Sequence, residues 1–324
     1  MTRSLQISTL VLALASALSL GCSKSSNFVS IDDEPEASAP RSTLEIPEAS
    51  PVPEAPVSAV PAPETPAPEP VASAPRPDEG IEFNAEKASL DLTKVERFEG
   101  EPKSEIAQWL EVKVVRGRGA LTRKALETLA ALPKLTELLW VEATIDADAG
   151  DAFRAVVSKP TLKKVRLAGL TLTGKSEFPP FALEALSSAP KLVDLDLSGS
   201  ALKGGDLSGA FQNGFNSLTK LNLYQAKIGD EGVAALEPLA SKLTSLNVDD
   251  AGITSKSADA IARFANLTFL HVGRSKLDDE AIAKFAALKK LQKIHVTRSD
   301  ATEEGAQKLR DQLPGCVVVS QPEN

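Results

Sequence analysis

The stretch from Leu218 to Ile228 reads LTKLNLYQAKI, in which the leucines follow the spacing L-x-x-L-x-L. The same frame returns at Leu243 as LTSLNVDDAGI, with valine as the last apolar residue, and at Leu267 as LTFLHVGRSKL. Successive side chains of a strand point to opposite faces. The alternating apolar residues therefore predict a short strand with one buried face in each copy.

The frame occurs in seven consecutive copies. They start at Leu135, Leu162, Leu192, Leu218, Leu243, Leu267 and Leu291, at intervals of 27, 30, 26, 25, 24 and 24 residues. The rest of each copy predicts a helix, because Asp or Ser precedes apolar residues at helical spacing, as in ITSKSADAIARFA and LDDEAIAKFAALKK. No copy can bury its apolar side alone, so we expect the copies to stack around one continuous core.

This skeleton resembles the leucine-rich repeat family, and the resemblance covers roughly residues 121 to 319. It implies an α/β fold, a horseshoe-shaped solenoid with a parallel sheet on its concave side and helices on its convex side. Where many members of the family carry asparagine after the strand, this chain is similar to the ribonuclease-inhibitor-like and cysteine-containing-like subclasses. The positions are Ala143, Leu170, Ser200, Ala226, Ala251, Ser275 and Ser299.

Other segments bound or interrupt the repeats. Residues 85–120 are expected to form an N-terminal cap, with a strand-like run from Trp109 to Val115 followed by RGRG. The leucine-rich repeat domain is expected over 121–324, including a C-terminal cap in which Cys316 faces inward. The insertion TGKSEFPPF, residues 173–181, is expected to bulge as a loop.

Residues 1–21 have the layout of a secretory signal peptide: Arg3 precedes an apolar run from Ile7 to Leu20, and a small residue precedes Cys22. The segment LSLGC resembles the lipobox of bacterial lipoproteins, with Ser19 where leucine is usual. The resemblance implies a lipid on Cys22 that anchors the chain at a membrane of the cell envelope, periplasmic or on the outer surface. An ordinary signal peptide with an incidental cysteine is the alternative.

Residues 22–84 are expected to be a disordered Pro/Ala/Glu-rich linker. Between Ile31 and Gly80 lie 13 of the 22 prolines and 11 acidic residues against two basic ones, so the segment cannot bury enough apolar surface to fold. A spacer is the favoured interpretation, and a ligand for a proline-recognition domain is the alternative. From Ile81 onward, 33 acidic residues balance 32 basic ones, which argues against a nucleic-acid partner.

His271 and His295 are the only histidines, and each lies between the second and third apolar residues of its frame. Both should point to the concave surface and stand side by side, because neighbouring strands lie about 4.8 Å apart. With Asp249 nearby they suggest a metal site, but neither HxH nor HExxH spacing supports one, so no metal or cofactor is expected. No set of nucleophile, base and oxyanion donors converges here, so no enzymatic activity is expected either. Repeat drift on a binding face explains both histidines.

The concave face is predicted to bind a protein or peptide, as members of the resembled family commonly do. Its middle reads as acidic (Asp194, Asp196, Asp249, Asp250) and one end as basic (Arg274, Lys293, Arg298), with Tyr224, Phe269 and Trp140 as aromatic candidates. The predicted binding residues are Asp196, Tyr224, Asp249, His271, Arg274, His295 and Arg298. The sequence thus predicts a non-enzymatic, membrane-anchored envelope lipoprotein with an unidentified protein ligand. The alternative is a structural envelope component without a specific ligand, whose surface charges form only a cross-strand ladder.

Overall fold

The computed structural model describes residues 81–95, 98, 109–207, 209–212 and 214–321. All of these belong to one compact unit, residues 68–324. The expected signal peptide, the lipidated Cys22 and the linker up to residue 80 lie outside the described residues, as does part of the expected N-terminal cap. No helix in the described ranges is long and apolar enough to cross a membrane.

The strands form one sheet in which neighbours in the chain are neighbours in space. Its order is β1-β2-β3-β4-β5-β7-β8-β9-β10-β11-β12, and β6 pairs with β4 beside this path. All pairs are parallel except β1 with β2. The strands are β1 (Glu82–Asn84), β2 (Ser89–Leu92), β3 (Val114–Leu121), β4 (Glu137–Ile145), β5 (Lys164–Ala168), β6 (Thr171–Leu172), β7 (Asp194–Asp196), β8 (Lys220–Asn222), β9 (Ser245–Asn247), β10 (Phe269–His271), β11 (Lys293–His295) and β12 (Val317–Val319).

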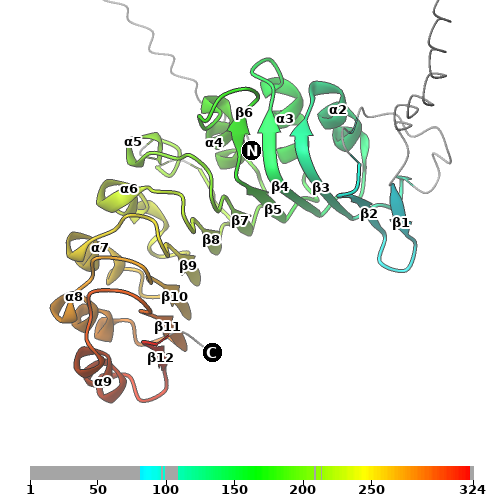
Figure 1. Ribbon diagram of the computed structural model, residues 1–324. Helices are drawn as coiled ribbons and strands as arrows, with labels where there is room; N and C mark the ends of the chain where they lie inside the picture. The colour runs from blue at the N-terminus through cyan, green and yellow to red at the C-terminus, as the bar shows by residue number, and fades with distance from the viewer. Residues whose placement is uncertain (1–80, 96–97, 99–108, 208, 213, 322–324) are drawn as a thin grey trace, which may run out of the picture. The chain divides into compact units, whose positions relative to one another are not determined.

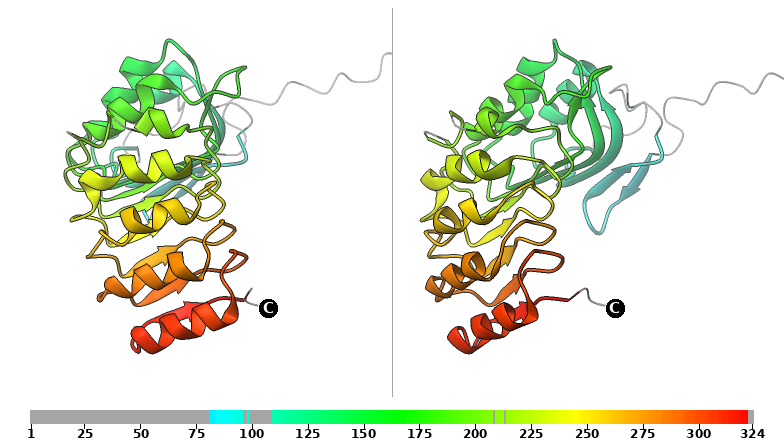
Figure 2. Two further views of the ribbon diagram at one scale, coloured as in Figure 1. Left: turned by 90° about the vertical axis from the view of Figure 1, so that its left-hand side faces the viewer. Right: turned by 60° about the vertical axis from the view of Figure 1, so that its left-hand side comes forward.

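From β3 onward, helical segments connect consecutive strands and lie together on one side of the sheet, as Figures 1 and 2 show. The α-helices are α2 (Arg123–Ala131), α3 (Gly150–Val157), α4 (Pro180–Ser187), α5 (Gly204–Leu207), α6 (Gly229–Ala235), α7 (Ala258–Ile261), α8 (Asp279–Ala283) and α9 (Glu303–Gln312). Shorter 3-10 turns are η1 (Glu237–Leu239), η2 (Ser255–Ser257) and η3 (Lys284–Ala287). The fold is therefore the predicted leucine-rich repeat solenoid, with a parallel sheet and helices on opposite sides of a shared core. We call the face of the sheet turned away from the helices the concave face.

The frame residues pack into a single continuous core, as the alternating pattern predicts. Leu221, Leu223 and Leu246 are buried, and the same holds for their counterparts in the other copies. The position after the strand, where asparagine is absent, is also buried or half-buried. Ser275 and Ser299 donate hydroxyl hydrogen bonds of 2.6 and 2.7 Å to the carbonyls of the residues three positions earlier, so serine satisfies the turn locally.

Hydrogen bonds between helix starts fix how successive repeats stack. The carboxylate of Asp230 accepts from the backbone and hydroxyl of Thr254, and that of Asp279 accepts in the same way from Thr302. Between them, the Ser255 hydroxyl accepts from the backbone N–H of Asp278 at 3.2 Å. Burial raises the pKa of Asp230, but the hydrogen bonds from Ser257 and Thr254 outweigh it and hold this pKa below its usual value. Each helix start thus serves its neighbour as a cap.

One expected placement was wrong. Trp140 occupies the third apolar position of its frame, so its side chain is 1% exposed in the core and not on the concave face. Its indole Nε1 donates to the Gly119 carbonyl at 2.9 Å, and its ring lies where a Cβ on Gly117 would be.

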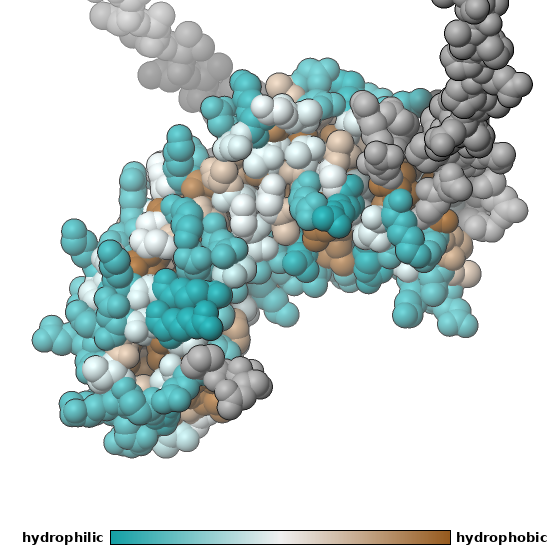
Figure 3. All heavy atoms as spheres, in the orientation of Figure 1, coloured by the Kyte–Doolittle hydropathy of each residue, from teal (hydrophilic) through white to brown (hydrophobic). Residues whose placement is uncertain are grey.

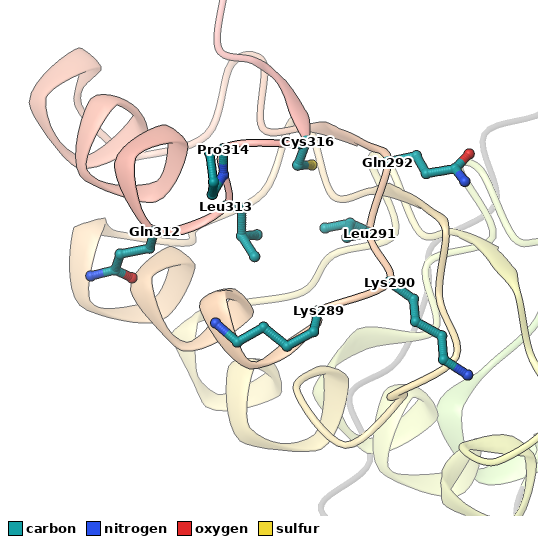
Figure 4. Close-up of a pocket in the computed structure, with 9 residues that line it drawn as sticks. Lys289, Lys290, Leu291, Gln292, Gln312, Leu313, Pro314 and Cys316 are labelled. Carbon is teal, nitrogen blue, oxygen red and sulfur yellow. The ribbon is translucent and has the colours of Figure 1, made fainter.

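Cys316 packs against the core, as expected, but it is only half-buried. Burial raises the pKa of its thiol. Together with Leu291 and Leu313 it lines a hollow of about 450 Å³, and Figure 4 shows how these side chains lie around it.

The N-terminal repeats extend further than the sequence indicates. The RGRG segment does not follow a strand but lies inside β3, which pairs in parallel with β4. Ahead of it, β2 pairs in parallel with β3 through Leu90 and Leu92, and β1 begins before the expected start of the cap at residue 85. Residues 173–179 of the insertion form a loop, as predicted, but Pro180 and Phe181 already belong to α4. Phe178 within the loop is buried.

An arginine side chain covers the free edge of the last strand, β12. Arg310 of α9 donates from Nε and Nη2 to the Val318 carbonyl at 3.4 and 3.2 Å, and it also pairs with Glu303 at 2.6 Å. The Ser320 hydroxyl bridges to the same carboxylate at 2.5 Å. Because exposed strand edges promote pairing with other chains, a charged side chain bonded to this edge disfavours association there.

Candidate functional site

The register of the sheet places the predicted column of residues in one row across the concave face. Cα pairing aligns Asp196 with Asn222, Asn222 with Asn247, Asn247 with His271, and His271 with His295. This confirms the predicted placement of the two histidines as neighbours. Because the row is set by the frame, each repeat contributes one side chain to it at the same height of the sheet.

The side chains in the middle of the row form hydrogen bonds with the backbone of their own repeats. The side-chain oxygens of Asp196, Asn222 and Asn247 each accept a hydrogen bond from the backbone N–H two residues later, at 2.9, 3.1 and 3.0 Å. Such Asx turns end the strand and start the turn. The next two members of the row are His271 and His295, which have no side-chain oxygen to form such a turn. The row therefore changes its structural role at the C-terminal end of the face.

The carboxylates of the concave face are held by neighbouring cations. The pairs are Lys164 with Asp194 at 3.6 Å, Arg166 with Asp196 at 3.3 Å, Lys227 with Asp250 at 2.5 Å, and Arg274 with Asp249. The hydrogen bond from Lys227 holds the pKa of Asp250 below its usual value. The expected acidic middle is thus present as residues, but its charge is largely balanced within the face.

Asp249 is the buried centre of a small polar cluster. Its side chain is 3% exposed, and it receives two hydrogen bonds from the Arg274 guanidinium, one of them from Nε at 3.0 Å. His271 Nε2 lies 3.6 Å from the same carboxylate, and the Arg274 guanidinium carbon lies 5.0 Å from the centre of the Tyr224 ring. Gly273 makes room, since a Cβ there would meet both Asp249 and Thr297. Arg274 is therefore bonded to a buried carboxylate, and its guanidinium is only partly available to a binding partner.

The two imidazoles are in contact. Their ring centres are 4.6 Å apart at an interplanar angle of 44°, and the Phe269 ring centre lies 5.8 Å from that of His295. Burial lowers the pKa of His271; Asp249 acts against this, while His295, Arg274 and Lys293 add to it. His271 is therefore neutral at pH 7. Within the described residues no group of three His, Cys, Asp or Glu side chains is arranged to hold a metal ion.

The turn after each strand holds a residue in the left-handed region of backbone space. Gly169 and Gly199 occupy this place in two repeats, but five other repeats use residues with a side chain. Their φ angles are 49° for Glu142, 57° for Gln225, 51° for Asp250, 45° for Arg274 and 56° for Arg298. This conformation costs an ordinary residue about 1 kcal/mol relative to glycine. A residue with a side chain stays in this conformation only where the surrounding structure holds it there.

Four of these five side chains have contacts that explain them. Glu142 pairs with Arg118, Gln225 bonds to Asp250, Asp250 pairs with Lys227, and Arg274 binds Asp249. Arg298 is exposed and has no side-chain hydrogen bond or ion pair with any residue in the described ranges. Sequence reasoning selected Arg274 and Arg298 but missed their strained backbone, for which the glycines at 169 and 199 were the available signal.

Comparison with known proteins agrees with the repeat. A family model described as leucine rich repeat matches residues 216–236 and 240–262, which contain β8, α6, β9, η2 and α7. No curated protein sequence matches the chain. Among solved structures, internalin C2 from Listeria monocytogenes is similar with 18% sequence identity, covering 65% of this chain and 72% of that chain, with a TM-score of 0.36.

Proposed function

We propose that this chain is a non-enzymatic envelope lipoprotein whose concave face binds a protein partner. Leucine-rich repeat proteins generally mediate protein–protein interaction, which is the coarse basis of the proposal. The observation that carries it for this chain is Arg298, an exposed arginine with a positive φ and without a described internal contact, in the turn that follows His295. Arginine and aromatic rings are typical of residues that dominate binding energy at protein interfaces.

The chemistry of the cluster favours binding over catalysis. A general base must be accessible and within hydrogen-bond reach of the substrate proton that it removes. Asp249 is buried and held by two hydrogen bonds from Arg274, so its carboxylate is engaged in the fold. The imidazoles contact each other and Phe269, which suits them to form part of an apolar contact surface.

The surface is suited to a partner recognised through polar groups. In the view of Figure 3, hydrophilic residues cover much of the surface and hydrophobic ones show between them in small patches. Among the described residues, the large hydrophobic side chains that are clearly exposed are Leu110, Val193 and Val317. The proposed partner therefore binds through specific charges and a few apolar anchors, without a broad hydrophobic interface.

Anchoring through Cys22 is part of the same proposal and rests on the lipobox-like sequence LSLGC. A lipid on this residue would hold the repeats at the membrane on the proline-rich linker. The expected result is that radiolabelled fatty acid enters the chain and that Cys22→Ser abolishes both labelling and membrane association. Labelling that persists in Cys22→Ser would contradict lipidation at this position. The ribonuclease-inhibitor-like subclass also stays a proposal, supported by the small residues after the strands.

Partner binding is tested by crosslinking the full chain in native cell envelopes and purifying it. Wild type is compared with Arg298→Glu, and Lys308→Glu on α9 is the matched control, because it reverses a charge on the helical side. The proposal predicts a partner that is retained by wild type and Lys308→Glu but lost by Arg298→Glu. Equal retention in all three would instead favour a structural envelope component or recognition by the helices.

A further inference from the structure

The charge available for binding differs along the concave face. Asp194, Asp196, Asp249 and Asp250 are each paired with a cation, so the face offers little unbalanced negative charge. At its C-terminal end the balance reverses. Arg274 is engaged by Asp249, but the exposed Arg298 in the next turn has no such carboxylate among the described residues. This end attracts a negatively charged group.

Apolar side chains follow on β12, the next strand after this turn. The register aligns Val319 of β12 with His295, and Val317 with Lys293, so both valines continue the concave face past the imidazoles. Val317 is 59% exposed, the largest fraction among the exposed large hydrophobic residues described. Phe269 and the two imidazole rings complete the surface. We call the group Phe269, His271, His295, Arg298 and Val317 the end patch.

The turns that carry Arg274 and Arg298 are stacked on each other. The backbone N–H of Arg274 donates to the Thr297 carbonyl at 2.9 Å, and both arginines have a positive φ. In the first turn a buried carboxylate accepts the guanidinium. A carboxylate from outside the described chain would complete the same arrangement for the second, because guanidinium and carboxylate form paired, charge-assisted hydrogen bonds.

We propose that the end patch binds an acidic peptide segment of a partner protein. A carboxylate of that segment pairs with Arg298, and an apolar side chain next to it covers the imidazoles and Val317. This inference rests on the proposed function, since it names the chemistry of the partner at the same face. It disfavours a basic partner at this end, because Asp194, Asp196 and Asp249 are already paired with cations.

The histidines add a dependence on pH. The charged and polar groups around them are Asn247 and Asp249 on the β9 side, Arg274 from the turn after β10, and Lys293 from β11; Val319 follows on β12. Asp249, the anion closest to His271, is already bonded to Arg274. Burial and the neighbouring cations lower the pKa of His271. A bound carboxylate next to His271 would favour its protonated form, so binding takes up a proton and tightens as pH falls.

The first test selects from a random peptide library displayed against the full chain in detergent. Wild type is expected to enrich sequences in which Asp or Glu lies next to an apolar residue, and Arg298→Gln is expected to lose this enrichment. Lys308→Gln is the control and should select as wild type does. Failure to enrich acidic sequences would overturn the inference, as would stronger binding of anionic lipid vesicles or oligonucleotides than of any selected peptide.

The second test measures affinity by fluorescence anisotropy with one selected peptide and its counterpart in which Gln replaces every Glu. Wild type should bind the acidic peptide about tenfold more tightly, since charged hydrogen bonds are involved. Affinity should rise between pH 7.5 and 5.5, and this rise should vanish in His271→Gln. Selected peptides that need the concave face but not acidic residues would sink this inference and leave the proposed function standing. Peptides indifferent to Arg298→Glu would contradict both.

Discussion

Replacing Arg274 by methionine should destabilise the protein far more than replacing its partner Asp249 by asparagine. The methionine retains an unbranched stem over Tyr224 but removes the cation from a carboxylate that is 3% exposed. Removing one partner of a buried pair costs about 3 to 5 kcal/mol, because the other charge is left uncompensated. His271, 3.6 Å away, can offset part of this by taking up a proton, so we expect about 3 kcal/mol at pH 7.5.

Asp249→Asn instead leaves Arg274 without its charged partner. The Arg274 side chain is 37% exposed and can turn to water, while asparagine at 249 keeps an oxygen that accepts a hydrogen bond. We expect a cost of about 1 kcal/mol. Arg298→Met is the control, since it has the same left-handed backbone one repeat later but no described ion pair, and it should lie within about 0.5 kcal/mol of wild type.

Urea unfolding followed by circular dichroism measures the three variants. With a typical slope for a protein of this size, about 3 kcal/mol corresponds to a midpoint shift of roughly 1 M for Arg274→Met. Equal costs for Arg274→Met and Arg298→Met would refute the buried pair.

Three further predictions concern the edge, the core and pH. Arg310→Ala should lower the free energy of unfolding in urea by about 1 to 2 kcal/mol, because it uncovers the Val318 carbonyl at the edge of the sheet. The exposed edge should also make the chain associate as its concentration rises, measured by size-exclusion chromatography. A monomer at all concentrations would contradict the protective role. Gly117→Ala should cost about 1 to 3 kcal/mol, since its Cβ would meet the buried Trp140 ring, and an unchanged melting temperature would show that this packing is wrong. The pKa of His271 is lower in the folded than in the unfolded state, so below about pH 6.5 the unfolded state binds the proton more readily and this residue removes stability as pH falls. His271→Gln should therefore gain stability relative to wild type between pH 7 and 5, measured by thermal melting, and parallel curves would contradict the shift.

The repeat could be predicted because its frame is local. Seven copies of an alternating apolar pattern determine strand, buried face and neighbour without knowledge of distant contacts, and the pairing of His271 with His295 followed from the same alignment. The L-x-x-L-x-L spacing is less regular toward the N-terminus. There the two buried leucines of β2, Leu90 and Leu92, do not repeat the frame. The RGRG segment was expected to follow a strand, although it lies inside β3 and Gly117 is required by the Trp140 ring.

The site was less predictable because it depends on which charges meet. The sequence showed acidic and basic columns, but side-chain pairing between repeats decides which charges are available. Arg274 and Arg298 occupy equivalent positions and look alike in sequence. Only the structure shows that Asp249 engages the former. Asp196, chosen as a binding residue, is occupied by Arg166 and by its own turn, which the spacing alone did not reveal.

The central claim is that the C-terminal end of the concave face contacts a partner. The most direct measurement places a photoreactive amino acid at position 317, which leaves Arg298 intact, and at position 308 as the control, in the full chain in living cells. Irradiation should produce one discrete crosslinked species from position 317 and none from position 308. The same species from both positions, or none from 317 while the chain remains folded, would contradict the assignment of binding to this face.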